Sequence, residues 1–393
     1  MVHYDPYAYE VHEDPYPIYR TLREDAPAYR QDALGFWALS RHADVLAAFR
    51  DTETFSSRCG VSLDRDAFHE NASTTMSFLA MDAPRHTRMR ALVSRGFTPR
   101  RVAELEPRIR EIAIGYLDAL APAGRCDFIR DLAGKLPMDV ISELLGVPPE
   151  DRAQLREWAD LVVHREEGVQ GMPAAATGAA LRMLQYFTAM LADRKARPRD
   201  DLTGALLRAE IDGDRLSDRE IIGFLFLMIV AGNETTTKLL GNAFYWLWRN
   251  PDARARVEAD PAAQVPLWVE ETLRYDNSTQ ALARVLTRDV ELHGEKLREG
   301  EKVVLLVGSA NRDERAFPDP DRFDPGRDTT RSLAFGQGAH FCLGAALARL
   351  EGRVALEEAL RRMPGYEIEP EGLVRVHSVN VRGFAALPVR WAA

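Results

Sequence analysis

One of the three cysteines stands in a glycine-rich loop, directly before a stretch rich in alanine and leucine. The loop runs from Phe335 to Gly344 as FGQGAHFCLG, with Cys342 near its end. Glycines such as Gly336 allow sharp turns that bring backbone N–H groups toward the sulfur. The positive end of a following helix favours the thiolate, and a thiolate with one open face suits a haem iron as axial ligand. The alternative is a buried structural cysteine in a glycine-rich turn.

The segment Ala231-Gly232-Asn233-Glu234-Thr235-Thr236 interrupts the longest apolar helix expected in the chain. Gly232 costs about 1 kcal/mol relative to alanine in a helix interior, and consecutive threonines compete for backbone carbonyls. Such a break inside an apolar helix is expected at a functional site. A hydroxyl beside a reacting oxygen can hold a proton donor, and a nearby carboxylate can relay protons from solvent. The alternative is a core helix weakened by glycine, with a solvated glutamate.

Two further pairs of residues lie about one helical turn apart. Pro84 begins an expected helix in which His86 and Arg90 share a face and together suit an anionic group. Glu271 and Arg274 are three residues apart on another expected helix and can form an ion pair. Taken alone each pair is weak evidence, because such residues are common on protein surfaces.

Hydrophobic periodicity predicts a mainly helical chain with small sheets. Apolar residues follow helical spacing over 82–96, 103–120, 217–249, 266–275 and 344–362. Ser217 and Glu220 form a capping box at the start of the longest of these helices. Strands are expected in a hairpin over 28–40, in the alternating stretch 283–307 with a turn at His293-Gly294, and in a final pair over 374–381 and 387–391.

Composition limits the classes of protein that the chain can represent. The 393 residues are 46% hydrophobic, and no linker or repeat divides them, so a single domain over 1–393 is expected. The net charge of -9, with basic residues spread along the chain, argues against a nucleic-acid partner. The longest apolar run, 221–231, is too short to cross a membrane. Without a signal peptide or a disulfide framework, we expect a cytoplasmic protein with no membrane anchor.

The pattern Phe335-x-x-Gly338-x-His340-x-Cys342-x-Gly344 resembles the haem-binding signature of the cytochrome P450 family, with every signature position filled. The resemblance extends over nearly the whole chain and is greatest to soluble bacterial members. It implies the cytochrome P450 fold, with haem b between the long central helix and the helix that follows the cysteine loop. The implied activity is that of a haem-thiolate monooxygenase.

The same resemblance implies roles for individual residues. Cys342 is the implied iron ligand, and Glu234 with Thr235 is the implied catalytic acid–alcohol pair. An arginine matching Arg322 is implied to complete a structural network with Glu271 and Arg274. The other implied cofactor-binding residues are His86, Arg90, Ala231, Gly232, Arg284, Phe335, Gly336, His340 and Gly344.

The implied cosubstrate is O2, with electrons from NAD(P)H delivered through a separate ferredoxin and ferredoxin reductase. A candidate face for the ferredoxin, or else an ordinary solvated basic face, consists of Arg88, Arg95, Arg100 and Arg101. Rival activities are a peroxide-driven peroxygenase, a nitric-oxide-reducing or dehydrating relative, and a non-oxygenating haem carrier or sensor. The Glu234–Thr235 pair favours the monooxygenase over all of these.

The expected substrate is a mainly apolar small molecule, such as a macrolide, terpenoid, steroid or fatty-acid-like compound of secondary metabolism. The segment 166–177, rich in glycine and alanine, is expected to be a mobile lid. The residues expected to contact the substrate are Leu227, Val230, Ala231, Gln280, Leu282 and Val379.

Overall fold

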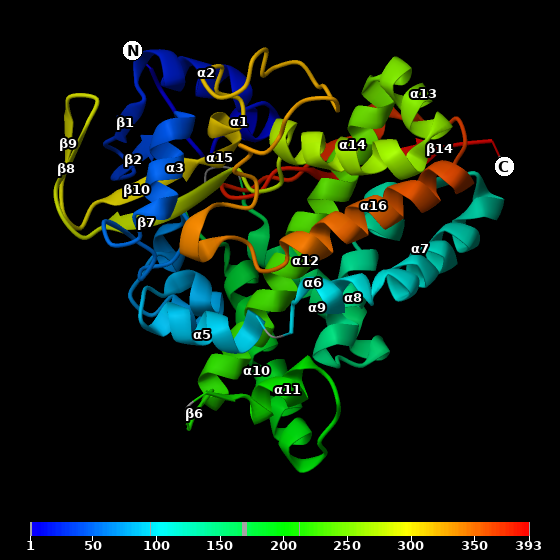
Figure 1. Ribbon diagram of the computed structural model, residues 1–393, viewed down its shortest axis with the longest axis horizontal. Coiled ribbons are helices and arrows are strands. Elements are labelled where there is room, and N and C mark those ends of the chain that lie inside the picture. Colours follow the sequence, from blue (N-terminus) through cyan, green and yellow to red (C-terminus); the bar gives the residue numbers. More distant parts are fainter. Residues whose placement is uncertain (1, 95, 167–170, 212, 393) are drawn as a thin grey trace.

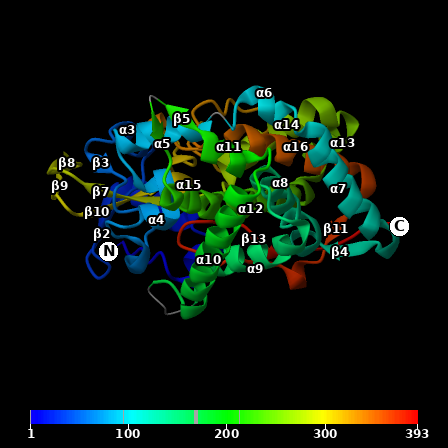
Figure 2. The ribbon, with the colours of Figure 1, turned by 90° about the horizontal axis from the view of Figure 1, so that it is seen from below.

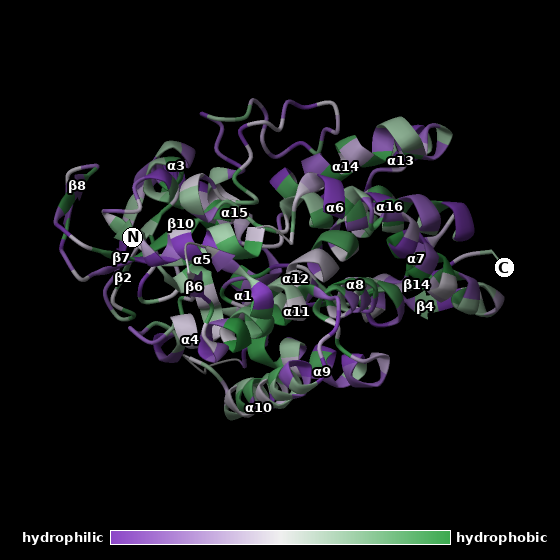
Figure 3. Cartoon of the chain, turned by 60° about the horizontal axis from the view of Figure 1, so that its bottom comes forward, coloured by the Kyte–Doolittle hydropathy of each residue, from purple (hydrophilic) through white to green (hydrophobic). Residues whose placement is uncertain are grey.

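A long central helix, α12 (Asp218–Arg249), lies between a helical region and a smaller region of sheet (Figure 1). The computed structural model describes residues 2–94, 96–166, 171–211 and 213–392. Helices dominate these residues and the strands are short, so the expected mainly α class with small sheets is confirmed. Figure 3 shows hydrophilic residues along the outer loops and mixed with apolar ones on α7 and α9.

The other α-helices are, in chain order, α1 (Tyr9–Glu13), α2 (Tyr16–Asp25), α3 (His42–Arg50), α4 (Ser73–Met76), α5 (Arg85–Ser94), α6 (Pro99–Ala103), α7 (Glu106–Leu120), α8 (Leu136–Leu145), α9 (Arg152–Val163), α10 (Ala174–Ala196), α11 (Leu202–Arg208), α13 (Pro251–Ala259), α14 (Pro261–Tyr275), α15 (Val307–Ala310) and α16 (Ala345–Arg362). A short π-helical segment, η4 (Ile129–Ala133), precedes α8.

The largest sheet has the strand order β1-β2-β10-β7-β3, formed by β1 (Ala28–Gln31), β2 (Phe36–Leu39), β10 (Lys302–Leu306), β7 (Ala281–Leu286) and β3 (Phe55–Ser56). The smaller sheets contain β11 (Glu367–Ile368), β14 (Pro388–Arg390) and β4 (Arg125–Asp127); β12 (Val374–Arg375) and β13 (Phe384–Ala386); β5 (Glu210–Ile211) and β6 (Asp214–Arg215); and β8 (Val290–Leu292) and β9 (Glu295–Leu297).

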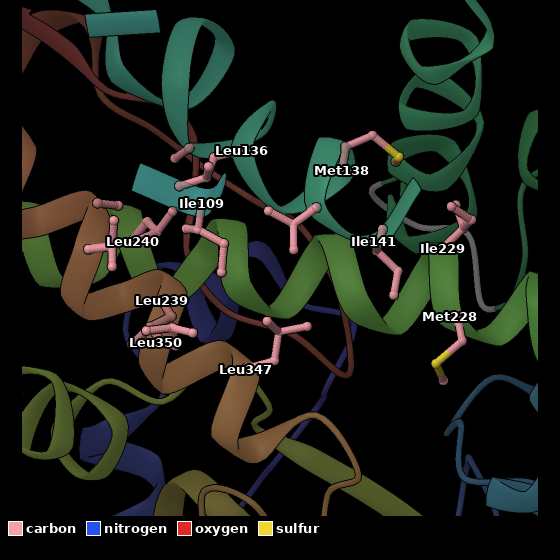
Figure 4. Packing of buried hydrophobic residues seen from close by; sticks show 14 of the residues in the cluster. Ile109, Leu136, Met138, Ile141, Met228, Ile229, Leu239, Leu240, Leu347 and Leu350 are labelled. Atoms are coloured by element: carbon pink, nitrogen blue, oxygen red, sulfur yellow. The ribbon is translucent and has the colours of Figure 1, made fainter. Parts of the chain in front are cut away.

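Helix α12 begins as its sequence predicts. The Ser217 side chain accepts a hydrogen bond from the Glu220 N–H, and the Glu220 carboxylate accepts one from the Ser217 N–H at 2.9 Å. Two of the backbone N–H groups that a helix start leaves unpaired are thereby satisfied. Apolar side chains of α8 and α16 pack on the middle of α12 from either side (Figure 4). The helix that carries Glu234 and Thr235 is therefore held on both flanks.

The hairpin over 28–40 and the turn at His293-Gly294 are confirmed by β1–β2 and β8–β9. The predicted final strand pair is wrong. Val374 and Arg375 pair with Ala386 and Phe384, whereas β14 pairs with β11 and β4. The chain changes sheet at Leu387, which is fully buried between the two strands. Period-2 alternation marks both strands but does not identify their partners.

Candidate functional site

A cavity of about 620 Å³ lies between the middle of α12 and the cysteine loop. Its floor is formed by the loop around Cys342 and the start of α16, and its roof by α12 from Phe226 to Leu239. Side walls come from residues near Val61 to Leu79 and from α9 and α10. Most of these side chains are apolar, so the cavity can hold a large, mainly apolar ligand and exclude water from it.

Cys342 faces this cavity from a tightly folded loop. Its N–H donates to the Phe335 carbonyl at 2.9 Å. Gly336 and Gly338 have φ angles of 67° and 70°, and a Cβ at Gly338 would lie 2.9 Å from the Phe49 carbonyl oxygen. Only glycine fits there without strain. Burial raises the pKa of the Cys342 thiol, and a hydrogen bond at Gly344 opposes that rise only in part. The helix end and nearby backbone N–H groups, which were expected to favour the thiolate, are therefore outweighed by burial, whereas coordination to a metal ion would favour it.

Four cationic or potentially cationic side chains meet beside the cysteine loop. The rings of His86 and His340 are 4.1 Å apart between centroids. Arg90 donates to the Phe341 carbonyl at 2.7 Å, and the 2% exposed Arg284 donates to the Ala283 carbonyl. We call His86, Arg90, Arg284 and His340 the cationic cluster.

Among the described residues, no carboxylate forms an ion pair with the cationic cluster. Burial lowers the pKa of Arg284 and His86, and the Asp82 charge acts to raise it. The Asp82 carboxylate, however, accepts hydrogen bonds from Ser56 and from the Ser57 N–H. Burial, followed by Arg284, His86 and Arg90, lowers the pKa of His340 to about 2, and burial lowers the pKa of Arg284 to about 10. The buried Nε2 of His86 has no hydrogen-bond partner. Buried charges are normally paired, so the arrangement fits a ligand that carries carboxylates.

The interrupted segment of α12 borders the same cavity without breaking the helix. Thr235 Oγ1 donates to the Ala231 carbonyl at 2.9 Å, and Ser278 donates to the Thr235 carbonyl at 2.7 Å. A Cβ at Gly232 would lie 3.3 Å from Ile141 of α8, so this glycine also permits close helix packing. The Thr235 hydroxyl is thus positioned at the cavity and can exchange its backbone partner for a water or a ligand.

Glu234 points away from solvent and is paired within the protein. It is 1% exposed, and its Oε2 lies 3.0 Å from Nζ of the buried Lys238. Burial favours a raised pKa, but the Lys238 charge and hydrogen bonds from Asp160 and Lys238 outweigh it and lower the pKa of Glu234. The helical spacing of four residues could have indicated the Lys238 pairing.

The structural network contains a different arginine from the one expected. Glu271 and Arg274, both fully buried, are joined by bonds of 2.7 and 2.8 Å. The Arg322 side chain is 65% exposed and pairs with Asp319 and Asp324 instead. Arg327, 9% exposed, lies 3.5 Å from Glu271 Oε1.

Arg322 nevertheless contributes its backbone to the network, because its carbonyl accepts from Arg274 and Arg327. The loop path turns the Arg322 side chain outward while the Arg327 side chain turns inward. Arg274 also donates to the carbonyls of Asn311 and Pro320, at 2.9 and 3.0 Å. The network therefore fixes the loop that leads to Cys342.

Of the expected substrate contacts, Leu227, Val230, Ala231 and Leu282 line the cavity. Gln280 and Val379 do not. The Gln280 side chain donates to the Asn277 carbonyl and packs against Gly308, and Val379 is buried in a separate cluster with Tyr4 and Leu22. The same two segments, both expected to contribute to the pocket, line the cavity through Ser278, Thr279, Ser378, Asn380 and Val381.

Part of the expected ferredoxin face is already engaged. Arg88 donates to Glu220 at 2.8 Å and to Asp214, so it is tied to α12 and β6. Arg100 is 90% exposed and pairs with Glu104, and Arg101 is exposed. Arg95 lies outside the described residues, as do residues 167–170 of the expected lid. None of the helices in the described part of the chain is long and apolar enough to cross a membrane.

Two acidic residues near the cavity were not anticipated. Asp160 of α9 is hydrogen-bonded to Glu234, a contact between distant segments for which the sequence offers no signal. Glu351 of α16 lines the cavity, is 2% exposed, and has its pKa raised to about 8 by burial. Its neighbours on the same helix face, Leu347, Val354 and Ala355, are apolar, and this spacing could have marked it as a buried carboxyl.

Comparison with known proteins gives matches over the whole chain. The cytochrome P450 family model matches residues 169–370. Cytochrome P450 123 of Mycobacterium tuberculosis is 55% identical over 386 residues, which cover 98% of this chain and 96% of the relative. The cytochrome P450 monooxygenase PikC of Streptomyces venezuelae is 39% identical, covering 96% of this chain and 91% of the relative. The crystal structure of CYP109E1 from Bacillus megaterium in complex with testosterone has a TM-score of 0.91 at 34% identity, covering 98% of this chain and 100% of that one.

Proposed function

Since this chain belongs to the cytochrome P450 family and is a P450 monooxygenase, we propose that it inserts one oxygen atom from O2 into a mainly apolar small molecule, by hydroxylation or epoxidation. Its fold is that of the family, and haem and O2 use follow from membership. The observation that carries the proposal is a cationic cluster with no ion-paired carboxylate among the described residues, at the edge of an apolar cavity whose floor holds Cys342.

The proposed cofactor site is made of residues from separate segments. Cys342 would ligate the iron, and the cationic cluster of His86, Arg90, Arg284 and His340 would bind the haem propionates. Phe335, Gly336 and Gly344 would shape the loop around the sulfur. Haem, when bound, supplies the iron at which O2 is reduced, and a thiolate ligand favours O–O cleavage.

The protein's own contribution is proton delivery and exclusion of water. We assign the Thr235 hydroxyl to holding a proton donor at the cavity, because its hydrogen bond to the Ala231 carbonyl fixes its position. Glu234, the residue before Thr235, would supply the proton to that donor. Ala231 and Gly232 would form the groove beside which O2 binds. The apolar walls keep water from competing with the substrate.

The substrate assigned to the cavity is mainly apolar with a few oxygenated groups, such as a secondary metabolite, terpenoid, steroid or fatty-acid-like molecule. The lining supports this assignment, since Leu227, Val230 and Leu282 are interspersed with Ser278 and Asn380. The testosterone complex of CYP109E1 shows that a relative with a similar fold binds a steroid.

Electrons are proposed to come from NAD(P)H through a separate ferredoxin and its reductase. The proposed location is the cytoplasm. The chain is proposed to form one domain over 1–393. The docking proposal now rests on Arg100 and Arg101, because Arg88 is engaged with Glu220 and Asp214. Charge reversal at Arg100 and Arg101 is expected to raise the apparent KM for ferredoxin.

The proposed ligation is tested by a visible spectrum of the purified protein after reduction and exposure to carbon monoxide. We expect a Soret band far to the red of that of a histidine-ligated haem, and its loss in Cys342→Ala. A band at the histidine position in fresh protein contradicts thiolate ligation. The variant Thr235→Ala then distinguishes the monooxygenase from its rivals. If more of the consumed electrons end in hydrogen peroxide instead of oxidised substrate, the monooxygenase is supported. If the ratio of oxidised substrate to consumed electrons is unchanged, a peroxygenase or a non-oxygenating protein is supported.

A further inference from the structure

Glu234 cannot exchange protons with solvent by itself. The side chain is 1% exposed, and its partners within its own helix are the buried Lys238 and Asn233, the latter at 3.5 Å. Lys238 is only 4% exposed, so it offers no path to water either. A carboxylate that delivers protons repeatedly has to be reloaded, and a further group must therefore connect Glu234 to the surface.

Asp160 is placed to make that connection. It lies near the end of α9, which packs across α12 (Figure 2). The residue is exposed, yet its carboxyl group is hydrogen-bonded to that of the buried Glu234. One side chain thus reaches both water and the interior acid.

A hydrogen bond between two carboxyl groups requires that one of them carries a proton, because ionised carboxylates are acceptors only. Although the Asp160 residue is partly open to solvent, desolvation of its carboxyl group, followed by the Glu234 charge, raises its pKa to about 8, whereas Lys238 and Arg156 oppose the rise. The pKa of Glu234 is lowered. At neutral pH the proton therefore resides on Asp160, and the two groups titrate as one coupled pair.

The surroundings of the pair come from three elements. Arg156 lies one turn before Asp160 on α9 and donates to the Arg130 carbonyl of η4 at 3.2 Å. On the α12 side, the Thr237 hydroxyl donates to the Ala133 carbonyl of η4 at 3.1 Å. These contacts fix α9 and α12 relative to the π-helical segment between them, a type of segment that often occurs at functional sites.

We propose that Asp160 is the outer acid of a two-carboxyl proton path, which takes up protons from solvent and passes them to Glu234. In each transfer the Asp160 O–H bond breaks, a Glu234 O–H bond forms, and solvent returns a proton to Asp160. The inference rests on the proposed function, in which Glu234 supplies protons to the cavity. Asp160 acts through Glu234 and contacts neither cofactor nor substrate.

The first experiment measures the proton itself, independently of turnover. Infrared spectra of the haem-loaded protein are recorded between pH 5 and 9 for the wild type, Asp160→Asn and the control Glu157→Gln. Glu157 is exposed on the same helix and bonded by Gln154. Because Glu351 is also expected to be protonated, spectra are taken as wild type minus variant. At neutral pH we expect a band from a protonated carboxyl group in the difference spectrum of wild type minus Asp160→Asn. The difference spectrum of wild type minus Glu157→Gln should lack this band.

The second experiment measures O2 consumption and peroxide yield with a surrogate ferredoxin and reductase, in H2O and D2O. We expect about a tenfold slower O2 consumption in Asp160→Asn, with a larger solvent isotope effect, and partial recovery in Asp160→Glu. Glu157→Gln should match the wild type. A merely structural role of Asp160 would leave the isotope effect unchanged.

The proposal is overturned if the Asp160→Asn difference lacks the carboxyl band, or if its isotope effect equals that of Glu157→Gln. Failure of the proposed function is recognised separately. In that case even the wild type lacks the red-shifted carbon monoxide band, whereas the infrared spectra still report the carboxyl pair. If Asp160→Asn retains the red-shifted carbon monoxide band, the cofactor site of this variant is intact.

Discussion

The structural network of Glu271, Arg274 and Arg327 and the cationic cluster are both groups of ionisable side chains near the cysteine loop, but they differ in completeness. In the network, Glu271 accepts two hydrogen bonds from Arg274 and one from the Asp324 N–H at 2.8 Å. In the cationic cluster, Arg284 donates to the Ala283 carbonyl and lies over the Phe49 ring but forms no ion pair, and His86 Nε2 has no hydrogen-bond partner. The first group satisfies itself, whereas the second needs an anion from outside.

This difference separates stability from ligand binding. Removing one member of a self-contained network leaves its partner buried and unpaired, so folding is weakened. Removing one of several like charges relieves repulsion in the empty chain and weakens only the binding of an anion. Glu351 provides a third case, a buried carboxyl for which burial is the sole cause of its pKa shift.

The largest effect is expected for Glu271→Gln, which leaves Arg274 without its carboxylate. We expect the free energy of unfolding to fall by about 3–5 kcal/mol, measured by urea denaturation of the haem-loaded protein. Arg322→Gln is the matched control, with an expected change within about 0.5 kcal/mol because that side chain is exposed. Equal losses in the two variants would mean that Arg322, and not Arg327, completes the network.

Glu351→Met tests the unpaired carboxyl through its pH dependence. Because burial raises its pKa from 4.5 to about 8, the folded chain holds a proton that the unfolded chain releases. The stabilising contribution is complete below pH 4.5 and is lost as the pH rises toward 8. The stability of Glu351→Met relative to wild type should therefore increase by about 3 kcal/mol between pH 5.5 and 7.5, as measured by denaturation at both values. A constant difference would show that Glu351 ionises normally.

Arg284→Met should have the smallest effect, and it should be confined to the cofactor. We expect haem to dissociate about tenfold to a hundredfold faster, since a charged hydrogen bond contributes about 1.5–3 kcal/mol, while the empty chain loses no stability. The measurement is transfer of haem to an excess of a haem-scavenging protein. Arg288→Met is the control, because Arg288 is exposed and pairs with Asp51. A destabilised empty chain would indicate that the cationic cluster is structural.

Local features were predictable from sequence, and long-range partners were not. The capping box of Ser217 and Glu220 and the glycine turns around Cys342 are set by neighbouring residues, so pattern and spacing identify them. Arg322 and Arg327 follow each other in a loop without periodicity, and only the backbone path decides which side chain turns inward. The contact of Asp160 with Glu234 joins segments 74 positions apart, counting from 160 to 234, and no pattern within either segment indicates it.

Arg88 has a consequence for how distant parts of the molecule communicate. Arg88 belongs to α5, the helix that carries His86 and Arg90. Its guanidinium donates hydrogen bonds to Glu220 in the first turn of α12 and to Asp214 and the Arg215 carbonyl of β6. A displacement of that first turn is therefore transmitted through the guanidinium to two of the side chains assigned to the haem propionates. The absorption spectrum of the bound cofactor is therefore expected to respond to changes at the amino-terminal end of the central helix.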